Sequence, residues 1–292
     1  MRGFMIALLS VGGVVFFSFC LFISSNLCMF WVFLELGTLS LVPLFFLNSH
    51  TSVLDSLFSY LIVSSMSSTF MICGFLFEGV YLLSFLGFLI KFGVFPFFGW
   101  VYNVILGSNW FVMWGFSTVL KSSFLFLSFF MSSGKGALLD TLLCSITFMF
   151  LATLFWVYSY SWVHFWCHMM ISSSAAFVAI SMVCSLASLL HLFFVYLLWA
   201  SLVLSFFYKC GSYVTWKGGV WFLYGVLLIS FPLSFSVVYK FLMSLSIFSC
   251  SFLVLFCWVI YSVSEQLFLV SFMVNSGLPR ASFGCVGGFL ME

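Results

Sequence analysis

The sequence predicts an all-α protein, a polytopic transmembrane bundle of about ten helices. Of its 292 residues, 65% are hydrophobic and 5% are charged, and the mean hydropathy is +1.33. Soluble domains carry about 25% charged residues, so lipid must be the solvent for most of this chain. Backbone polar groups in lipid have to be satisfied internally, which leaves helices or a closed barrel. The apolar runs are about twenty residues long and lack the alternation of barrel strands, so they predict helices.

Short polar and turn-forming clusters divide the chain into ten predicted spans. They cover residues 4–24, 27–47, 53–77, 79–104, 110–130, 137–159, 165–185, 188–208, 219–243 and 246–270. We expect residues 1–270 to form one transmembrane domain and residues 271–292 to form a short tail. The connections leave no room for a soluble domain that could house a nucleotide, a flavin or a metal cluster. The net charge of +2 gives no indication of a nucleic-acid partner.

Basic residues predict the orientation of these spans, because they concentrate on the electrically negative side. Four of them share one side with both termini: Arg2, Lys209, Lys217 and Arg280. The other side holds Glu78 and Lys135, which is offset by Asp140. The termini are therefore expected to face the negative compartment, which is the matrix in a mitochondrion. The 45 phenylalanines fit a T-rich organelle gene better than any packing demand.

Four charged residues inside predicted spans are singled out as candidates for a function: Glu35, Lys91, Lys121 and Lys240. Each costs roughly 2.5–3.5 kcal/mol at the centre of a membrane helix, so their retention indicates a function. About ten apolar residues flank Lys91 and Lys121 on both sides, roughly 15 Å of helix, which exceeds the reach of a lysine to the interface. For Lys240 such snorkelling stays open, and a static Glu–Lys clamp is the alternative for Glu35.

Three of the four prolines fall inside spans that carry one of these charges: Pro43, Pro96 and Pro232. Pro96 cannot donate to the carbonyl of Phe92, and Gly93 loosens the same turn, so the helix should break beside Lys91. Broken helices at membrane depth are tolerated only where protein or water surrounds them. They supply the free backbone dipoles and the water that an ion path needs.

The histidines give a weaker signal. His164 and His168 stand at i and i+4, the spacing of a two-ligand metal face, but the sequence shows no third ligand nearby. An interfacial aromatic belt with Trp162 and Trp166 is the favoured interpretation. His191 could act as a proton relay, although nothing in the sequence localises it. We predict no metal site.

Five segments in unbroken order over residues 25–245 carry a family resemblance. They are FWVFLELGTLSLVPLFFLNSH with Glu35 and Pro43, LIKFGVFPFFGWVYNVILG with Lys91 and Pro96, STVLK with Lys121, HMMISSSAAF with serines 172–174, and FPLSFSVVYKF with Pro232 and Lys240. Together they resemble subunit 2 of mitochondrial NADH dehydrogenase (ubiquinone), an antiporter-like membrane subunit of respiratory complex I. The Lys91 segment is the most specific part. The sequence departs from the family at Phe33, where the family has glycine, and we expect the tail to lack the family's last helix.

The resemblance implies an antiporter-like fold in which broken helices flank a hydrated axis. It assigns Glu35 the role of partner carboxylate, Lys91 and Lys121 that of a central protonable relay, and Lys240 that of exit lysine. It also implies a location in the mitochondrial inner membrane, beside the other membrane-arm subunits of a proton-translocating NADH:ubiquinone reductase. NADH, FMN, the iron–sulfur clusters and ubiquinone would belong to other subunits, so this chain would bind no cofactor and hold no redox centre.

Electrostatics makes such a relay feasible. Burial favours the neutral amine of a lysine and a nearby carboxylate favours the ammonium, so moving Glu35 relative to Lys91 would load or unload a proton. Exchanging protons near neutrality requires the pKa of a lysine to fall by about 3 units, which is about 4 kcal/mol. Driving one charge against about 150 mV costs roughly 3.5 kcal/mol, which is the same scale. Two other hypotheses stay open: a stand-alone cation/proton antiporter with the same relay, and a structural membrane subunit whose charges are static clamps.

Overall fold

Every regular element in the computed structural model is a helix, for the residues that it describes: 2–24, 26–47, 52–77, 81–125, 137–210, 218–232 and 234–277. The elements are α1 (Arg2–Ile23), α2 (Leu27–Phe45), α3 (Ser52–Leu76), α4 (Tyr81–Phe92), α5 (Gly99–Leu106), α6 (Trp110–Ser117), the 3-10 helix η1 (Val119–Ser123), α8 (Ala137–Val157), α9 (Trp162–Ser181), α10 (Leu186–Cys210), α11 (Gly218–Leu227), α12 (Phe235–Phe248) and α13 (Phe252–Gly277). This architecture confirms the predicted all-α membrane bundle.

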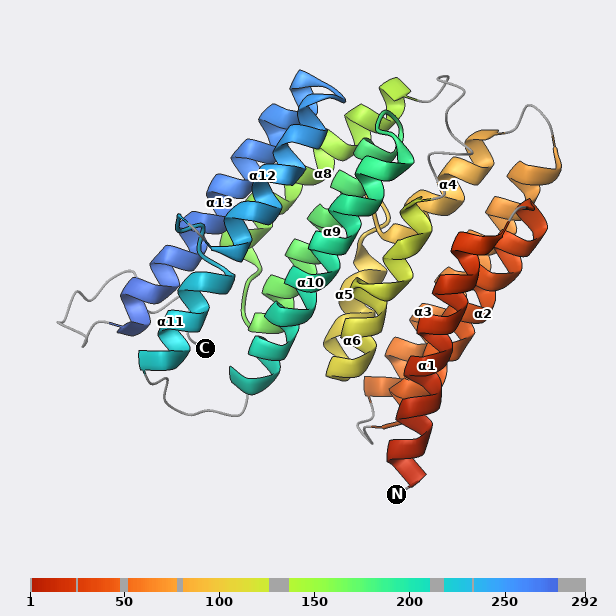
Figure 1. Cartoon of the computed structure of the whole chain (residues 1–292), viewed down its shortest axis with the longest axis horizontal. Coiled ribbons are helices and arrows are strands. Elements are labelled where there is room, and N and C mark those ends of the chain that lie inside the picture. The colour runs from red at the N-terminus through yellow and green to blue at the C-terminus, as the bar shows by residue number, and fades with distance from the viewer. Residues whose placement is uncertain are drawn as a thin grey trace.

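Pairs of short helices interrupt the series of long ones. Among the described residues, seven helices are long and apolar enough to cross a membrane, namely α1, α2, α3, α8, α9, α10 and α13. The others follow one another as parts of interrupted crossings: α4 and α5, α6 and η1, and α11 and α12. Figure 1 shows α11 and α12 running one after the other along the bundle. The interruptions therefore leave backbone groups without helical partners at depth, where lipid offers none.

Helix α9 forms the centre of the bundle. In its apolar window 89% of the residues are buried, against 22% in α1 and 44% in α13. Figure 1 places α1, α2 and α3 on one side and α12 and α13 on the other. The start of α1 and the ends of α10 and α13 lie at the same end of the bundle (Figure 1). An even number of crossings accounts for this arrangement.

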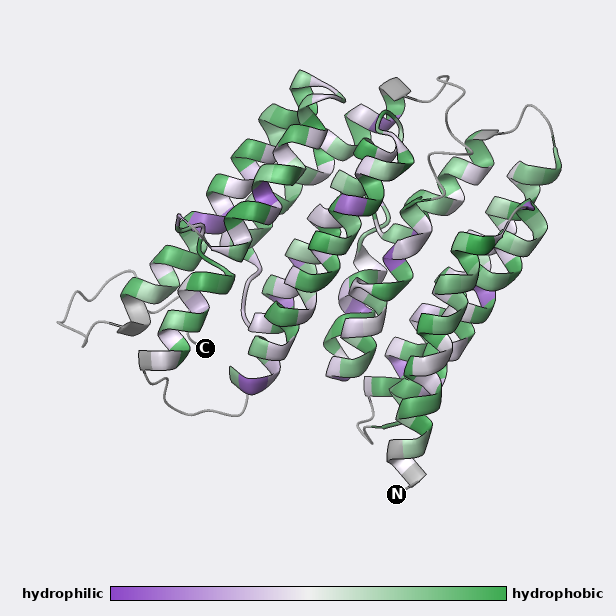
Figure 2. Cartoon of the chain, viewed as in Figure 1, coloured by the Kyte–Doolittle hydropathy of each residue, from purple (hydrophilic) through white to green (hydrophobic). Residues whose placement is uncertain are grey.

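The outer surface of the bundle is apolar. Large hydrophobic side chains project from it, among them Phe252 at 76%, Phe222 at 72% and Leu9 at 71% exposure. Figure 2 shows that hydrophobic residues dominate the helices and that hydrophilic ones are few. Monomeric soluble proteins do not leave so large an apolar area exposed, so this surface fits lipid.

Small residues bring α3 and α4 into close contact. A Cβ atom on Gly87 would lie 2.8 Å from the carbonyl oxygen of Ser67, and one on Gly74 would collide with the backbone of Ser84. Membrane helices gain no hydrophobic driving force from each other, so close backbone packing across glycine and serine is what holds such pairs together. This packing fixes the position of α4, whose last turn carries Lys91.

Candidate functional site: a row of buried charges

Lys91 and Glu35 form an ion pair between α4 and α2. The Nζ atom of Lys91 lies 3.5 Å from Oε1 of Glu35, and the two side chains are 11% and 20% exposed. On the Glu35 side, the hydroxyl of Thr38 donates to the carbonyl of Glu35 and the hydroxyl of Tyr60 donates to the carbonyl of Thr38. The pair is longer than the 2.7–2.9 Å typical of a tight charge-assisted hydrogen bond, so its two groups are only loosely joined.

The helix breaks beside Lys91, as the sequence predicts. Helix α4 ends at Phe92, and Gly93 adopts a φ of +65°, a left-handed conformation that glycine reaches without steric cost. Pro96 lies in the six-residue break before α5. The indole nitrogen of Trp100 donates to the carbonyl of Ile90 at 3.0 Å, so a side chain satisfies part of the interrupted backbone. Lys91 therefore sits at the end of a helix rather than in a continuous one.

A second break carries Lys121. Helix α6 ends at Ser117, and Lys121 lies in η1, where its backbone N–H donates to the carbonyl of Thr118 at 3.2 Å. Thr118 marks the interruption with φ −114° and ψ −71°. The predicted span over residues 110–130 contains no proline, and the sequence did not reveal this break. Lys121, like Lys91, therefore lies beside an interruption of its helix.

Lys121 is 2% exposed and is held by neutral oxygen atoms. Its Nζ donates to the hydroxyl of Ser173 at 2.5 Å, the carbonyl of Met170 at 2.8 Å and the hydroxyl of Tyr196 at 3.0 Å. Within the described part of the chain, no carboxylate lies at ion-pair distance from it. A static clamp would require an opposite charge, so the surroundings of Lys121 favour a different role.

A cavity of about 30 Å³, which we call the Lys91–Lys121 cavity, separates the two lysines. Its polar lining comes from five elements and includes Thr38, Tyr60, Ser64, Ser67, Lys91, Lys121 and Ser174. About 10–15 Å³ suffices for one water molecule in a polar cavity, so this one has room for about two. The nearby hydroxyls of Ser117 and Ser122 are buried without a hydrogen-bond partner among the described residues. Space and polar groups for a water-mediated connection are both present.

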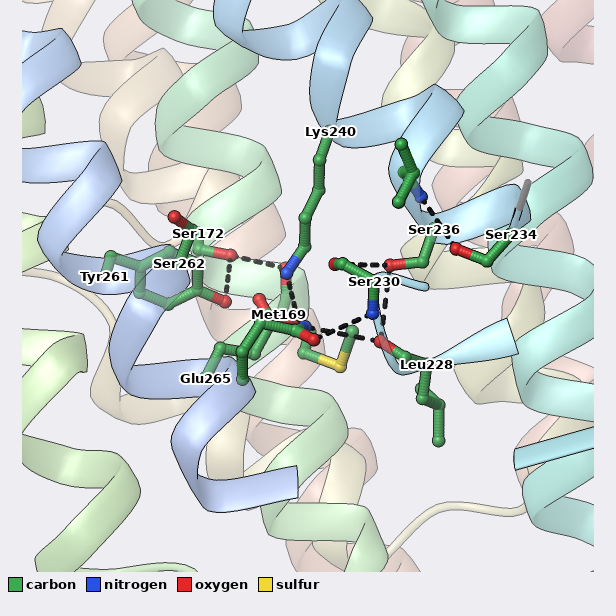
Figure 3. Close-up of polar contacts among 12 residues, drawn as sticks. Met169, Ser172, Leu228, Ser230, Ser234, Ser236, Lys240, Tyr261, Ser262 and Glu265 are labelled. Carbon is green, nitrogen blue, oxygen red and sulfur yellow. Dashed lines mark hydrogen bonds and ion pairs between the residues drawn. The ribbon is translucent and has the colours of Figure 1, made fainter. Parts of the chain in front are cut away.

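Lys240 is paired with a carboxylate on the neighbouring helix. Its Nζ lies 2.8 Å from Oε1 of Glu265 on α13, and the two side chains are 13% and 4% exposed (Figure 3). This contact answers the question left open for Lys240. The side chain points into the bundle, toward Glu265, instead of snorkelling to an interface.

The break between α11 and α12 lies beside this pair and contains Pro232. Gln266 on α13 bridges it: the backbone N–H of Ser230 donates to Gln266 Oε1 at 2.9 Å, and Gln266 Nε2 donates to the carbonyl of Leu228 at 3.3 Å. The same amide donates to Oε1 of Glu265 at 3.2 Å. Leu228 is the residue whose carbonyl Pro232 leaves without a helical donor, so the glutamine joins the loosened backbone to the buried ion pair.

A second cavity, the Ser173–Lys240 cavity, has a volume of about 20 Å³. Its polar lining is Ser172, Ser173, Tyr239, Lys240, Tyr261, Ser262 and Glu265. Ser173 also contacts Lys121 directly, and Ser172 donates to the hydroxyl of Tyr261 at 2.7 Å. The cavity has room for one water molecule. It therefore connects the surroundings of Lys121 with the Lys240–Glu265 pair.

These contacts place all four charged residues singled out in the sequence in one row. We call this row the charged axis; its members in order are Glu35, Lys91, the Lys91–Lys121 cavity, Lys121, Ser173, the Ser173–Lys240 cavity, Lys240 and Glu265. Sequence reasoning missed Glu265, although it lies inside the predicted span 246–270 and carries the same signal as Glu35. It also missed Tyr196 and Gln266, which no sequence pattern marks.

The histidines lie elsewhere. His168 is fully buried, with Nδ1 2.6 Å from the hydroxyl of Tyr102 and Nε2 3.3 Å from the carbonyl of Tyr158, so the prediction of an interfacial position is wrong for it. The ring of His164 packs 5.1 Å from that of Tyr158, which fits an aromatic belt. His191 is exposed, so it is no interior relay. The described residues contain no cluster of three or more His, Cys, Asp or Glu side chains suited to a metal ion.

Part of the predicted topology lies outside the described residues, namely Glu78, Lys135, Lys217, Arg280 and the side chain of Arg2. Lys209 is exposed in the last turn of α10. Asp140, which the sequence analysis sets against Lys135, is 1% exposed in the first turn of α8 and accepts a hydrogen bond from the thiol of Cys144 at 3.5 Å. A carboxylate in a first helical turn is stabilised by the helix dipole.

Comparison with known proteins gives a structural match alone. The sequence matches no family model and no curated protein. The fold is similar to a chain in the structure of respiratory complex I from Thermus thermophilus with bound aureothin, with a TM-score of 0.72 and 14% sequence identity. The match covers 96% of this chain and 75% of the Thermus chain. At this identity the likeness establishes the shared fold.

Proposed function

We propose that this chain is an antiporter-like membrane-arm subunit of respiratory complex I and that it conducts protons along the charged axis. Two independent lines support the proposal. The sequence carries the Lys91 segment that resembles subunit 2 of the mitochondrial enzyme, and the fold is similar to a chain of the Thermus complex over 96% of this one. The first line uses residue identities, Lys91 among them, and the second compares the fold.

The observation that carries the proton-conducting role is the position of Lys121. It lies between two cavities that each have room for water, and it contacts both sides: it lines the Lys91–Lys121 cavity, and it is hydrogen-bonded to Ser173, which lines the next one. An amine in this place can take a proton from water on one side and give it to a hydroxyl or water on the other. The hydrogen-bond partners of Lys121 are neutral oxygen atoms. Neither the charged nor the neutral form of the amine is therefore tied to a counter-ion.

Glu35 and Lys91 supply the coupling in this mechanism. At 3.5 Å the carboxylate favours the ammonium form of Lys91, and a greater separation favours release of the proton. The released proton enters the Lys91–Lys121 cavity, which Lys91 lines. Driving one charge against 100 mV takes about 2.3 kcal/mol, a scale that rearranging a buried ion pair can supply.

The finer assignment follows the resemblance. We propose that the chain is the mitochondrial subunit 2, that it lies in the inner membrane with both termini in the matrix, and that it neighbours the other membrane-arm subunits. Electron transfer from NADH to ubiquinone takes place in other subunits, and this chain contributes proton translocation to the oxidoreductase. A neighbouring subunit transmits the redox energy by moving Glu35 relative to Lys91.

A stand-alone cation/proton antiporter is the second candidate. The completeness of the charged axis within a single chain favours it, because exchange would then require no partner. A purely structural subunit is disfavoured by Lys121, a buried cation that pairs with no carboxylate among the described residues. Such a cation destabilises a scaffold that has no use for it.

Co-purification tests the proposal. Membranes are dissolved in mild detergent and separated on a native gel, and each band is assayed for this chain by mass spectrometry and for NADH:quinone reductase activity in the gel. We expect the chain to migrate with the activity. Migration as a separate small species that catalyses sodium/proton exchange in vesicles would assign it to the stand-alone antiporters instead.

A further inference from the structure

Two cysteines from distant parts of the sequence meet at one end of the bundle. Cys184 lies in the turn between α9 and α10, and Cys250 lies in the turn between α12 and α13. Figure 1 shows both turns at the end of the bundle opposite to the start of α1. The carbonyl oxygen of Ser246 lies 3.9 Å from the sulfur of Cys184 and 3.3 Å from that of Cys250. The two thiols are also hydrogen-bonded to each other.

Both cysteines stand in the same relation to a long helix. A serine follows each of them and directly precedes the helix, namely Ser185 before α10 and Ser251 before α13. The carbonyl of Ser185 accepts from the N–H of Leu189 at 3.1 Å, and that of Ser251 accepts from the N–H of Leu255 at 3.2 Å. A helix N-terminus carries a partial positive charge, which favours the thiolate form of a nearby cysteine. Both thiols therefore lie outside the spans, beside an electropositive helix end.

Three hydrogen-bond donors contact the sulfur of Cys184. They are the thiol of Cys250, the hydroxyl of Ser249 at 3.4 Å and the hydroxyl of Ser188 in the first turn of α10. The hydrogen bond from Cys250 lowers the pKa of Cys184 below the usual range of a thiol, and the two hydroxyls act in the same direction. Cys184 is only partly buried, so a small reagent can reach it. It has the features of a reactive thiolate.

Cys250 has the complementary features. Because its thiol donates to Cys184, the pKa of Cys250 is raised, and burial and the negative charge of Asp140 in the first turn of α8 raise it further. Cys250 therefore keeps its proton while Cys184 loses one. A thiolate beside a thiol is the arrangement found where one cysteine reacts with an oxidant and its neighbour resolves the product.

Two other roles fit this pair less well. A metal site needs further ligands, and the part of the chain that the structure describes holds no group of three or more suitable His, Cys, Asp or Glu side chains. Packing in an apolar core is the role of Cys167, which is fully buried. Cys184 and Cys250 are partly exposed and have polar neighbours, so core packing does not account for them.

We propose that Cys184 and Cys250 form a reversible disulfide bond, in which Cys184 is the peroxide-reactive cysteine and Cys250 the resolving one. The bond would join the turn after α9 to the turn after α12. These two helices carry Ser173 and Lys240, which line the Ser173–Lys240 cavity. The inference concerns the thiols alone and does not rest on the proposed proton-conducting function.

The reaction with hydrogen peroxide balances in two steps. The thiolate of Cys184 attacks one peroxide oxygen and the O–O bond breaks. The hydroxide that leaves takes up the proton that Cys184 lost on ionising, and Cys184 becomes a sulfenic acid. The sulfur of Cys250 then attacks the sulfenic sulfur, and the S–O bond breaks. The proton of Cys250 leaves with this hydroxide as a second water molecule. Two thiols have been oxidised to a disulfide and one peroxide reduced to two waters. Two molecules of a reduced thiol such as glutathione reverse the change by exchange and become a disulfide themselves.

Mass spectrometry of the full complex in its membrane tests the bond. The membranes are treated with hydrogen peroxide, the remaining thiols are blocked with N-ethylmaleimide in denaturant, and the protein is digested with chymotrypsin. We expect the disulfide-linked Cys184–Cys250 peptide after treatment and its loss after incubation with reduced glutathione. Cys28, exposed in the first turn of α2, is the internal control. No linked peptide at a peroxide dose that oxidises Cys28 would refute the bond, and a linked peptide that resists glutathione would refute its reversibility.

Dimedone, which traps sulfenic acids, tests the two roles. Cys250→Ser keeps a hydroxyl donor beside Cys184 but removes the resolving thiol, so we expect about tenfold more dimedone adduct on Cys184 than in the unmodified chain. In Cys184→Ser the remaining Cys250 should stay unlabelled. An equal yield of adduct on Cys250 in Cys184→Ser would contradict the assignment. If either variant does not assemble, the linked peptide in the unmodified chain decides.

Discussion

The Nζ atom of Lys91 lies 3.5 Å from Oε1 of Glu35, in a pair whose two side chains keep 11% and 20% exposure. At the other end of the charged axis the ion pair measures 2.8 Å. The longer ion pair is the one made by Lys91 of α4, and α4 ends directly after it, beside Gly93 with its positive φ. A movement of this backbone would change the distance between the two charges.

Glu35→Gln tests that relationship. The substitution removes a charge while keeping the shape, so we expect proton pumping to fall while complex assembly stays near normal. The change is measured as proton uptake into vesicles per NADH oxidised, with assembly followed on native gels. A complex that fails to assemble, with the residual fraction pumping normally, would instead make Glu35 a structural clamp.

Gly93→Ala tests the break. A Cβ atom at φ +65° costs about 1–2 kcal/mol, and here it would also meet the side chain of Val101. We expect a lower thermal midpoint of the detergent-purified complex. Gly99→Ala is the control, because a Cβ atom there has no neighbour within 4 Å. Equal midpoints for the two variants would mean that the left-handed turn after α4 does not form.

The two breaks that carry lysines differ in how far the sequence reveals them. Beside Lys91 the cause is covalent: Pro96 lacks an N–H, and Gly93 permits positive φ, so both can be read from the residue types. Beside Lys121 no residue is a helix breaker. That interruption accompanies contacts to Ser173 and Tyr196 on other helices, which a single-sequence reading cannot supply.

Uninterrupted helices were predictable to within a few residues. The span predicted over 137–159 is α8 (Ala137–Val157), and the one over 188–208 is α10 (Leu186–Cys210). Their bounds follow from local composition alone. For Glu265 the sequence is less informative. Its position inside a span could be predicted, but its pairing with Lys240 depends on how α12 and α13 are rotated relative to each other.

Ser173→Ala probes the link between the two cavities. Its hydroxyl is the polar group that contacts Lys121 and also lines the Ser173–Lys240 cavity, so we expect slower proton transport with a stability loss of only about 1 kcal/mol. Ser181→Ala is the matched control on the same helix, since the Ser181 hydroxyl binds a carbonyl of its own helix at 2.8 Å. Equal transport rates in the two variants would remove Ser173 from the path.

Topology can be tested with epitope tags at the amino terminus and directly after Cys210. The start of α1 and the end of α10 lie at the same end of the bundle (Figure 1), so both tags should become accessible in the same compartment, and the basic residues predict the matrix. Protease protection in intact and opened mitoplasts reads out the side. Tags on opposite sides would contradict both the number of crossings and the orientation.

The central claim is that Lys121 carries protons, and Lys121→Met tests it most directly. The substitution nearly conserves volume and removes a buried cation, so a structural role predicts an unchanged or more stable complex with normal pumping. A relay predicts an assembled complex that moves fewer protons per NADH, because the path has lost the amine between its two cavities. The measurement is the proton-to-electron ratio in reconstituted vesicles, with assembly checked on a native gel. A lower ratio is the result expected here, and a normal ratio in a normally assembled complex would contradict the account.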